Sequence, residues 1–149
     1  MDKYIPIGEV VGIYFQDKKG GPNRLIEQGY FKKDKGLVCD IHFGHSRRQV
    51  SLFTVEGKKE IQSLDTKGLC TERFHENIRV KDLDLDKLKV GVMIKIGETI
   101  HEVTEIGKRC FPECEIIKRG NTCSLSKQVF FTRVIKDGQV NIHDKILVI

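Results

Sequence analysis

Short runs of strand-forming residues, separated by turn residues, limit the fold of this chain more than any other feature of its sequence. The runs share a high content of apolar and β-forming side chains and lie at residues 9–15, 25–31, 49–55, 92–103, 129–135 and 146–149. Within the run at 92–103, Gly97-Glu98 predicts a tight turn between two strands, and a further turn is expected at residues 136–139. Many short strands at close intervals predict a mainly β barrel or sandwich, and closure into a barrel would hide the strand edges.

Helical sequence is scarce and lies in the middle of the chain. Residues 55–62 predict one short helix, and residues 70–78 are a second candidate. Asp82, Asp84 and Asp86 alternate with leucines, which is typical of an exposed edge or turn and does not indicate a paired-carboxylate active site. A chain of 149 residues with 39% hydrophobic content suits one domain over residues 1–149.

Charge and hydropathy exclude several classes of function. The 26 basic and 21 acidic side chains give a net charge of +5, which suits an anionic small-molecule ligand but forms no basic arm for nucleic acid. No secretory signal begins the sequence, and no apolar stretch approaches the roughly 18 residues that cross a bilayer. We therefore expect a cytoplasmic protein without membrane contact, whose five cysteines are reduced.

Cys110 is the cysteine whose surroundings in sequence best suit chemistry. Lys108 and Arg109 precede it directly, and positive charge favours the nucleophilic thiolate. Cys114 lies four residues later and could resolve a persulfide on Cys110 by forming a disulfide. The alternative is a small buried side chain that happens to be cysteine.

An ordered set of short motifs resembles the MOSC domain, which occurs at the carboxyl terminus of molybdenum-cofactor sulfurases and as small stand-alone bacterial proteins. The motifs run over nearly the whole chain: Gly8-Glu9-Val10-Val11-Gly12-Ile13, Gly36-Leu37-Val38-Cys39-Asp40-Ile41-His42-Phe43-Gly44, Arg48-Gln49-Val50-Ser51-Leu52, Glu76-Asn77-Ile78, a cysteine after a strand, and Gly138-Gln139-Val140-Asn141-Ile142-His143-Asp144-Lys145-Ile146. The resemblance implies a MOSC-like β-barrel with a few short helices.

The resemblance also implies a function and a set of site residues. The family's proposed roles are to bind the molybdenum cofactor (molybdopterin) and to carry sulfur as a cysteine persulfide, and some stand-alone relatives act on N-hydroxylated bases. By position, the pocket residues that match the family pattern are Asp40, His42, Gly44, Arg48, Gln49, Ser51, Glu76 and Asn77. The family cysteine falls on Cys110, with Cys114 as the rival position. Arg47 and Arg48 are natural donors to a cofactor phosphate.

The resemblance further implies a partner protein. Full-length cofactor sulfurases keep their pyridoxal-phosphate chemistry in a separate desulfurase domain, for which this chain is too short. The sulfur must then come from elsewhere, and the expected partner is a cysteine desulfurase or a molybdoenzyme. One departure concerns Cys39, because the family has glycine at this position. If the backbone there has a positive φ, the cysteine must strain or reshape the loop before Asp40.

The sequence leaves open the roles of the histidines and the choice between three functions. His42 could hold an oxyanion or act as an acid, or it could be a surface histidine bonded to the loop backbone; His45 more readily fits the second description. His75, His101 and His143 show no shared spacing with them. Two other functions compete: a zinc site formed by Cys110, Cys114 and Cys123 with Cys39 or a histidine, and a binding module that delivers cofactor without a reactive thiol.

Overall fold

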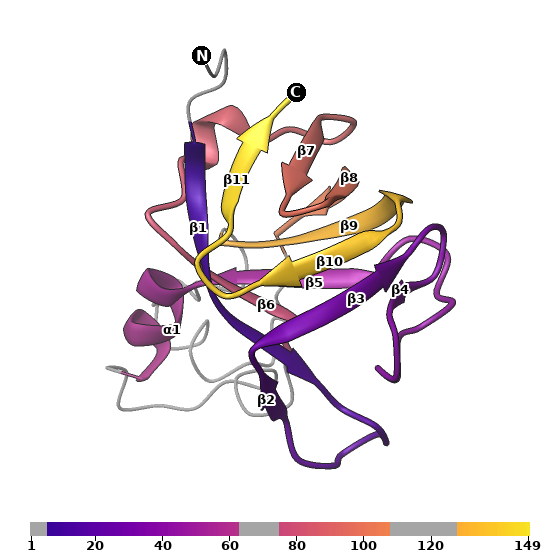
Figure 1. Ribbon diagram of the computed structural model, residues 1–149. Coiled ribbons are helices and arrows are strands. Elements are labelled where there is room, and N and C mark those ends of the chain that lie inside the picture. Colours follow the sequence, from indigo (N-terminus) through magenta and orange to yellow (C-terminus); the bar gives the residue numbers. More distant parts are fainter. Residues whose placement is uncertain (1–5, 63–74, 108–127) are drawn as a thin grey trace.

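The computed structural model describes residues 6–62, 75–107 and 128–149, and it is mainly β (Figure 1). The strands are β1 (Pro6–Phe15), β2 (Arg24–Ile26), β3 (Gln28–Lys32), β4 (Gly36–Leu37), β5 (Val50–Thr54), β6 (Ile78–Lys81), β7 (Met93–Ile96), β8 (Thr99–Ile106), β9 (Val129–Lys136), β10 (Gly138–Asn141) and β11 (Lys145–Val148). One α-helix, α1 (Val55–Gln62), and one 3-10 turn, η1 (Leu85–Lys87), occur among the described residues.

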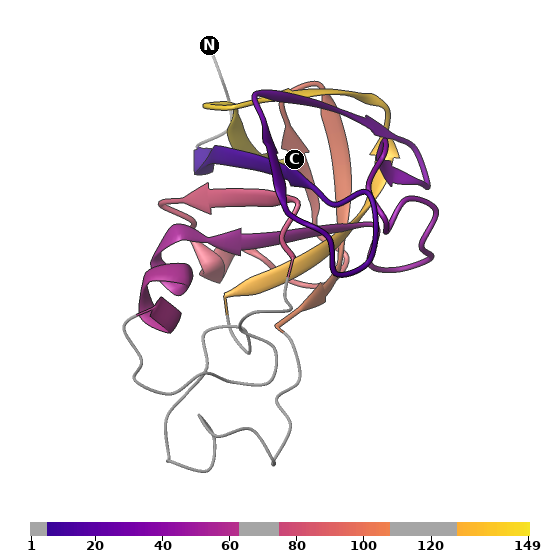
Figure 2. The same ribbon diagram turned by 90° about the horizontal axis from the view of Figure 1, so that it is seen from below.

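The large sheet closes on itself. Its strands follow the order β11-β7-β8-β9-β5-β6-β1-β2, and β11 also pairs with β1, so that all of them except β2 form a ring. Pairing is antiparallel throughout the ring except between β5 and β6, which run parallel. Figure 2 looks into this arrangement from below. The fold is therefore a closed β-barrel, as the strand pattern and the family resemblance predict.

Apolar side chains from every strand of the ring fill its interior. The fully buried members of this core are Val10, Ile13, Val50, Leu52, Ile78, Val80, Ile94, Ile96, Val103, Phe130, Val134 and Ile146. Burial of such side chains is the main term that stabilises a small β domain, at roughly 1.5–3 kcal/mol for each. The closed wall is therefore a rigid support for the side chains outside it.

A second, three-stranded sheet with the order β10-β3-β4 lies against the barrel (Figure 1). Its strand β3 buries Phe31 and exposes Tyr30, the alternation expected of a sheet with one solvated face. The chain leaves β4 into the loop of residues 38–48, which carries most of the residues discussed below. None of the helices within the described part of the chain is long and apolar enough to cross a membrane.

Several local predictions are confirmed and several are wrong. The helix at 55–62 and the turn at Gly97-Glu98 are both present. The prediction of a second helix at 70–78 is wrong for residues 75–78, the part that the structure describes. Residues 75–77 are not helical, and Ile78 begins β6. The turn at 136–139 is too long, since Gly138 already starts β10 and pairs with Phe31.

Two further differences concern strands. The run at 25–31 contains two strands, β2 and β3, with Glu27 between them. The sequence at 49–54 predicts a strand with Val50 and Leu52 on one face and Ser51 and Phe53 on the other, and β5 is buried at every position of both faces. Its inner face meets the barrel core and its outer face carries Ser51 and Phe53, which are covered as well. A strand buried on both sides has no reason to alternate in sequence.

Candidate functional site

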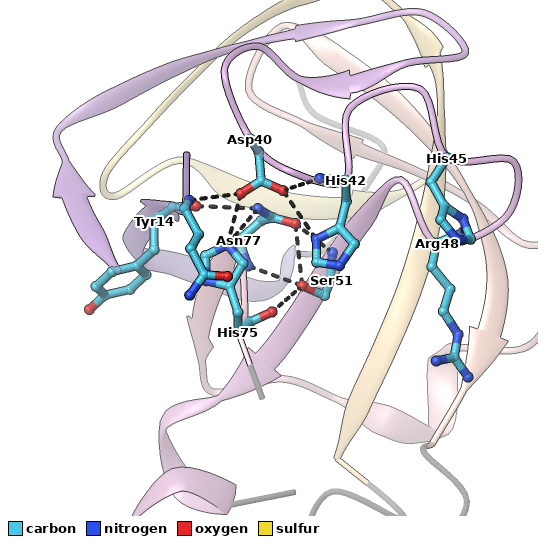
Figure 3. Close-up of polar contacts among 9 residues, drawn as sticks. Tyr14, Asp40, His42, His45, Arg48, Ser51, His75 and Asn77 are labelled. Carbon is cyan, nitrogen blue, oxygen red and sulfur yellow. Dashed lines mark hydrogen bonds and ion pairs between the residues drawn. The ribbon is translucent and has the colours of Figure 1, made fainter. Parts of the chain in front are cut away.

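Asp40 is the centre of a polar network on the outside of the barrel wall (Figure 3). It follows β4 in the loop of residues 38–48, and only 5% of its surface is exposed. Its Oδ1 accepts hydrogen bonds from the backbone N–H of Gln16 at 2.9 Å and from His75 Nε2 at 2.8 Å. Its Oδ2 accepts from the backbone N–H of His42 at 3.1 Å and from His42 Nδ1 at 3.2 Å. The carboxylate thus ties β1, the loop and the residues before β6 together.

These contacts keep Asp40 ionised. Burial on its own would raise the pKa of the carboxyl group, because the charged form loses hydration. The hydrogen bonds from His42 and His75, and those from the backbone N–H groups of Gln16 and His42, act in the other direction and outweigh burial. The net effect holds the pKa of Asp40 well below its ordinary value, so the group is a fixed negative charge that only accepts hydrogen bonds.

Ser51 and Asn77 place His75 against this carboxylate. Ser51 Oγ donates to the carbonyl oxygen of His75 at 2.8 Å, and the Ser51 backbone N–H donates to Asn77 Oδ1 at 3.0 Å. The Asn77 amide donates in turn to the carbonyl oxygen of Tyr14 at 3.3 Å. The parallel pairing of β5 and β6 brings Ser51 beside Asn77, although 26 residues separate them. The polar atoms of both side chains are therefore used within the fold.

Three imidazole rings lie in a row at this site. The rings of His42 and His75 are stacked, with centroids 6.1 Å apart and an interplanar angle of 15°. The rings of His42 and His45 meet edge to face, with centroids 6.4 Å apart. His75 is almost fully buried, and its Nδ1 has no hydrogen-bond partner among the described residues. His42 is partly exposed and His45 is exposed, so the row runs from the interior to solvent.

Arg48 adds positive charge beside the loop, although a carboxylate partly compensates it. Its Nε and Nη2 both donate to Glu105 Oε2 at 2.7 Å, and the guanidinium lies 4.6 Å from the centre of the Phe131 ring. Two of its five N–H donors are used in this ion pair. Arg47 is exposed, and its carbonyl oxygen accepts from Thr104 Oγ1 at 2.7 Å. Both arginines lie just before the start of β5.

Gln49 has a structural contact. Its side chain is buried, and its Oε1 accepts from the backbone N–H of Val134 in β9 at 3.0 Å. Gly36 lies close by with a φ of +110°, and a Cβ atom there would come within 2.7 Å of the Gln49 carbonyl oxygen. Only glycine allows β4 to approach β5 so closely. This approach sets the position from which the loop to Asp40 departs.

The backbone of Cys39 has a positive φ, which is the case in which the sequence predicts strain in the loop before Asp40. Its φ is +78°, in the left-handed region that favours glycine, and its side chain is exposed. The strain does not displace the next residue from the network, because Asp40 makes all four of its hydrogen bonds. The loop therefore accommodates the cysteine in its backbone, at a cost in stability.

The predicted catalytic residues Cys110 and Cys114 lie outside the described residues, as do Cys123 and the adjacent cations at 108 and 109. Within residues 6–62, 75–107 and 128–149, no group of three or more histidine, cysteine, aspartate or glutamate side chains could hold a metal ion. The predicted pocket residues Asp40, His42, Ser51 and Asn77 do come together in one network. Arg47, Arg48 and Gln49 lie beside it on the same chain segment.

His75 is the site residue that the sequence did not indicate. It lies 35 residues from Asp40, and no motif spacing links the two. Its position next to the Glu76-Asn77 pair is the only sequence signal that could have drawn attention to it. Asn77 Nδ2 lies 3.4 Å from His75 Nε2, so the two side chains lie on the same side of the segment. A residue two positions before a predicted pocket asparagine was therefore a reasonable candidate.

Comparison with known proteins identifies the fold. No family model matches the chain, and no curated protein matches it in sequence. The crystal structure of YuaD from Bacillus subtilis is similar, with a TM-score of 0.70 and 21% identity over 99% of this chain and 98% of that one. YiiM from Escherichia coli matches with a TM-score of 0.61 and 14% identity over 95% of this chain and 69% of that one. At these identities the likeness shows a shared barrel fold.

Proposed function

We propose that this chain is a MOSC-type domain that binds an anionic cofactor of the molybdopterin kind at the loop of residues 38–48 and carries sulfur on Cys110. The observation that carries the proposal is the network around Asp40, which holds His42 and His75 in fixed orientations with His45 and Arg48 close by. The sequence resemblance to MOSC domains and the fold shared with YuaD and YiiM support it.

The donor groups of the loop fit the phosphate end of such a cofactor. A phosphate group needs several hydrogen-bond donors and positive charge. His45 is exposed, Arg48 keeps N–H groups that Glu105 does not use, and Arg47 is exposed beside them. The net charge of +5 favours the approach of an anion. We assign these three side chains to the phosphate, and the network around Asp40 to the ordering of the loop.

The sulfur-carrying step would take place on the Cys110 thiolate. The thiolate attacks the outer sulfur of a persulfide on a partner desulfurase, the sulfur–sulfur bond of the donor breaks, and the donor leaves as a thiolate. Cys110 then holds the persulfide, so no external oxidant or reductant is needed. Bound cofactor would supply the molybdenum centre that receives the sulfur.

Mass spectrometry of the intact protein tests sulfur carriage. The protein is incubated with a cysteine desulfurase and cysteine, and the expected product carries the added mass of a sulfur atom. Cys110→Ser should abolish the addition, whereas Cys39→Ser, which alters an exposed thiol of the described site, should not. Loss of the added mass in Cys114→Ser alone would assign the role to Cys114. No added mass in the wild-type protein would contradict the proposal.

A binding module without a reactive thiol is the second candidate. The described network favours it, because the side chains around the ionised Asp40 donate and accept hydrogen bonds, which suits binding. The thiol next to this network belongs to Cys39, and its side chain is exposed. Binding of purified molybdopterin without sulfur addition would support this candidate. Stoichiometric zinc in protein purified without added metal would instead support a zinc site formed by the cysteines.

A further inference from the structure

The tautomer of His42 follows from its contact with Asp40. The carboxylate is ionised and carries no proton, so the hydrogen in the 3.2 Å contact between His42 Nδ1 and Asp40 Oδ2 belongs to the imidazole. A neutral His42 is therefore protonated at Nδ1, and its Nε2 is a hydrogen-bond acceptor. His42 Nε2 has no partner among the described residues, and the side chain is 37% exposed. The loop thus presents an acceptor nitrogen to solvent at this point.

His45 has the opposite tautomer. Its Nδ1 accepts from the backbone N–H of Arg48 at 3.2 Å and lies 3.4 Å from the backbone nitrogen of Arg47, which also donates toward it. Because Nδ1 accepts, a neutral His45 carries its hydrogen on Nε2. The exposed ring therefore offers a donor. The centroids of the two rings are 6.4 Å apart, so a ring whose Nε2 donates lies next to a ring whose Nε2 accepts (Figure 3).

We infer that this pair binds a phosphate group together with one proton, which is held between a phosphate oxygen and His42 Nε2. His45 Nε2–H donates to one phosphate oxygen directly. A second oxygen without a proton would face the lone pair of His42 Nε2 and be repelled, so either the phosphate or the imidazole must be protonated. The inference rests on the proposed function, because it states how the anionic ligand of the same site is held.

The proton makes binding depend on pH. The second pKa of a phosphate monoester is about 6, so above pH 7 the free ligand carries no proton. Each phosphate that binds to neutral His42 must then take up one proton from solvent, and the dissociation constant rises about tenfold for each pH unit. The charged or titratable groups around His42 are Asp40, His45, His75 and the Arg48–Glu105 pair. Asp40 stays ionised throughout this range and cannot supply the proton.

The test is a titration with methyl phosphate, followed by NMR of the histidine rings at several values between pH 6 and pH 8.5. We expect binding to weaken about tenfold per pH unit above pH 7. Nitrogen spectra of the free protein should show the hydrogen on Nδ1 of His42 and on Nε2 of His45. The reverse assignment at His42 would overturn the inference without any variant.

Three variants separate the roles of the rings. In His42→Asn the amide can still donate to Asp40 but offers no acceptor in place of Nε2, so we expect the dependence on pH to disappear. In the matched control His75→Gln the amide can replace Nε2–H toward Asp40, and the dependence should remain. His45→Ala should weaken binding at every pH without removing the dependence.

The outcomes distinguish this inference from the function on which it rests. Binding of methyl phosphate that does not change with pH, or that changes equally in His42→Asn and the wild-type protein, would overturn the inference and leave the anion site intact. No binding to the wild-type protein at any pH would overturn both the inference and the anion site. Sulfur carriage on Cys110 would be unaffected, because it is measured separately.

Discussion

The core histidine His101 should make the stability of this protein fall as the pH is lowered from 7 to 5. Its side chain is fully buried inside the barrel, between β8 and β9. Thr99 Oγ1 donates to the carbonyl oxygen of Ile96 at 2.7 Å, so it accepts from His101 Nε2–H at 2.8 Å. His101 Nδ1 then accepts from the Thr132 hydroxyl at 2.7 Å. The neutral ring therefore makes a hydrogen bond with each of its two nitrogens.

The sign and size of the effect follow from the shift in pKa. Burial lowers the pKa of His101 to about 3 from an unfolded value of 6.5, because the charged form loses its hydration. The native state excludes a proton that the unfolded chain binds, so the contribution of His101 is complete above pH 6.5 and is lost as the pH falls from 6.5 towards 3. At about 1.4 kcal/mol per pH unit, the free energy of unfolding should decrease by about 2 kcal/mol between pH 6.5 and pH 5. This is a large part of the roughly 5–15 kcal/mol typical of a domain.

Urea unfolding followed by circular dichroism measures this directly, and it suits a chain that contains no tryptophan. The comparison is between the pH dependence of the wild-type protein and that of His101→Gln. A glutamine side chain does not titrate, so the variant should be less stable at pH 7 but should lose about 2 kcal/mol less on going to pH 5. Equal slopes in the two proteins would refute the reasoning, whatever the absolute stabilities.

Three shorter predictions concern the site and the surface. Cys39→Gly should stabilise the protein by about 1 kcal/mol in urea unfolding, because φ at this position is +78°, while Cys39→Ala should give no gain; a gain in both would show that strain is not the cause. Asp40→Asn should cost about 3 kcal/mol, since the amide group cannot accept from all four donors, and a loss below about 1 kcal/mol would contradict the central role of the carboxylate. Hydrogen bonds from Lys145, and next from His143, lower the pKa of Glu9 to about 2, so its stabilising effect is present above pH 4.5 and is lost as the pH falls towards 2. NMR titration of Glu9 in high salt should move this pKa back towards 4.5, and a pKa that ignores salt would argue against an exposed ionic origin.

The barrel could be predicted from the sequence because its cause is local. Each strand carries its own β-forming residues and ends at its own turn, as at Gly97-Glu98. The helix at 55–62 was predicted to the residue for the same reason. The predictions of secondary structure were wrong where contacts between distant segments determine it. Ile78 belongs to a strand because it pairs with Leu52, a partner that no short window of sequence contains.

The candidate site was predicted in part for a similar reason. Asp40 and His42 are two residues apart, so one motif contains both the acceptor and one of its donors. The second donor, His75, comes from beyond the helix that follows β5, and no motif spacing links it to Asp40. The tautomers of His42 and His45 could not be predicted from the sequence either, because each depends on which ring nitrogen forms a hydrogen bond with a neighbouring group.

The parallel pairing of β5 and β6 is the step that turns these separated residues into one site. In an antiparallel barrel, neighbouring strands joined by a tight turn bring together residues that are close in sequence. The crossover from β5 to β6 instead sets Ser51 beside Asn77 and directs His75, which precedes β6, towards the loop that follows β4. Asp40 then accepts from Gln16, His42 and His75 and joins three segments with one charge. His42 gains its orientation from this junction, so a substitution that weakens the pairing of Ser51 with Asn77 should disturb the ring of His42 without touching it.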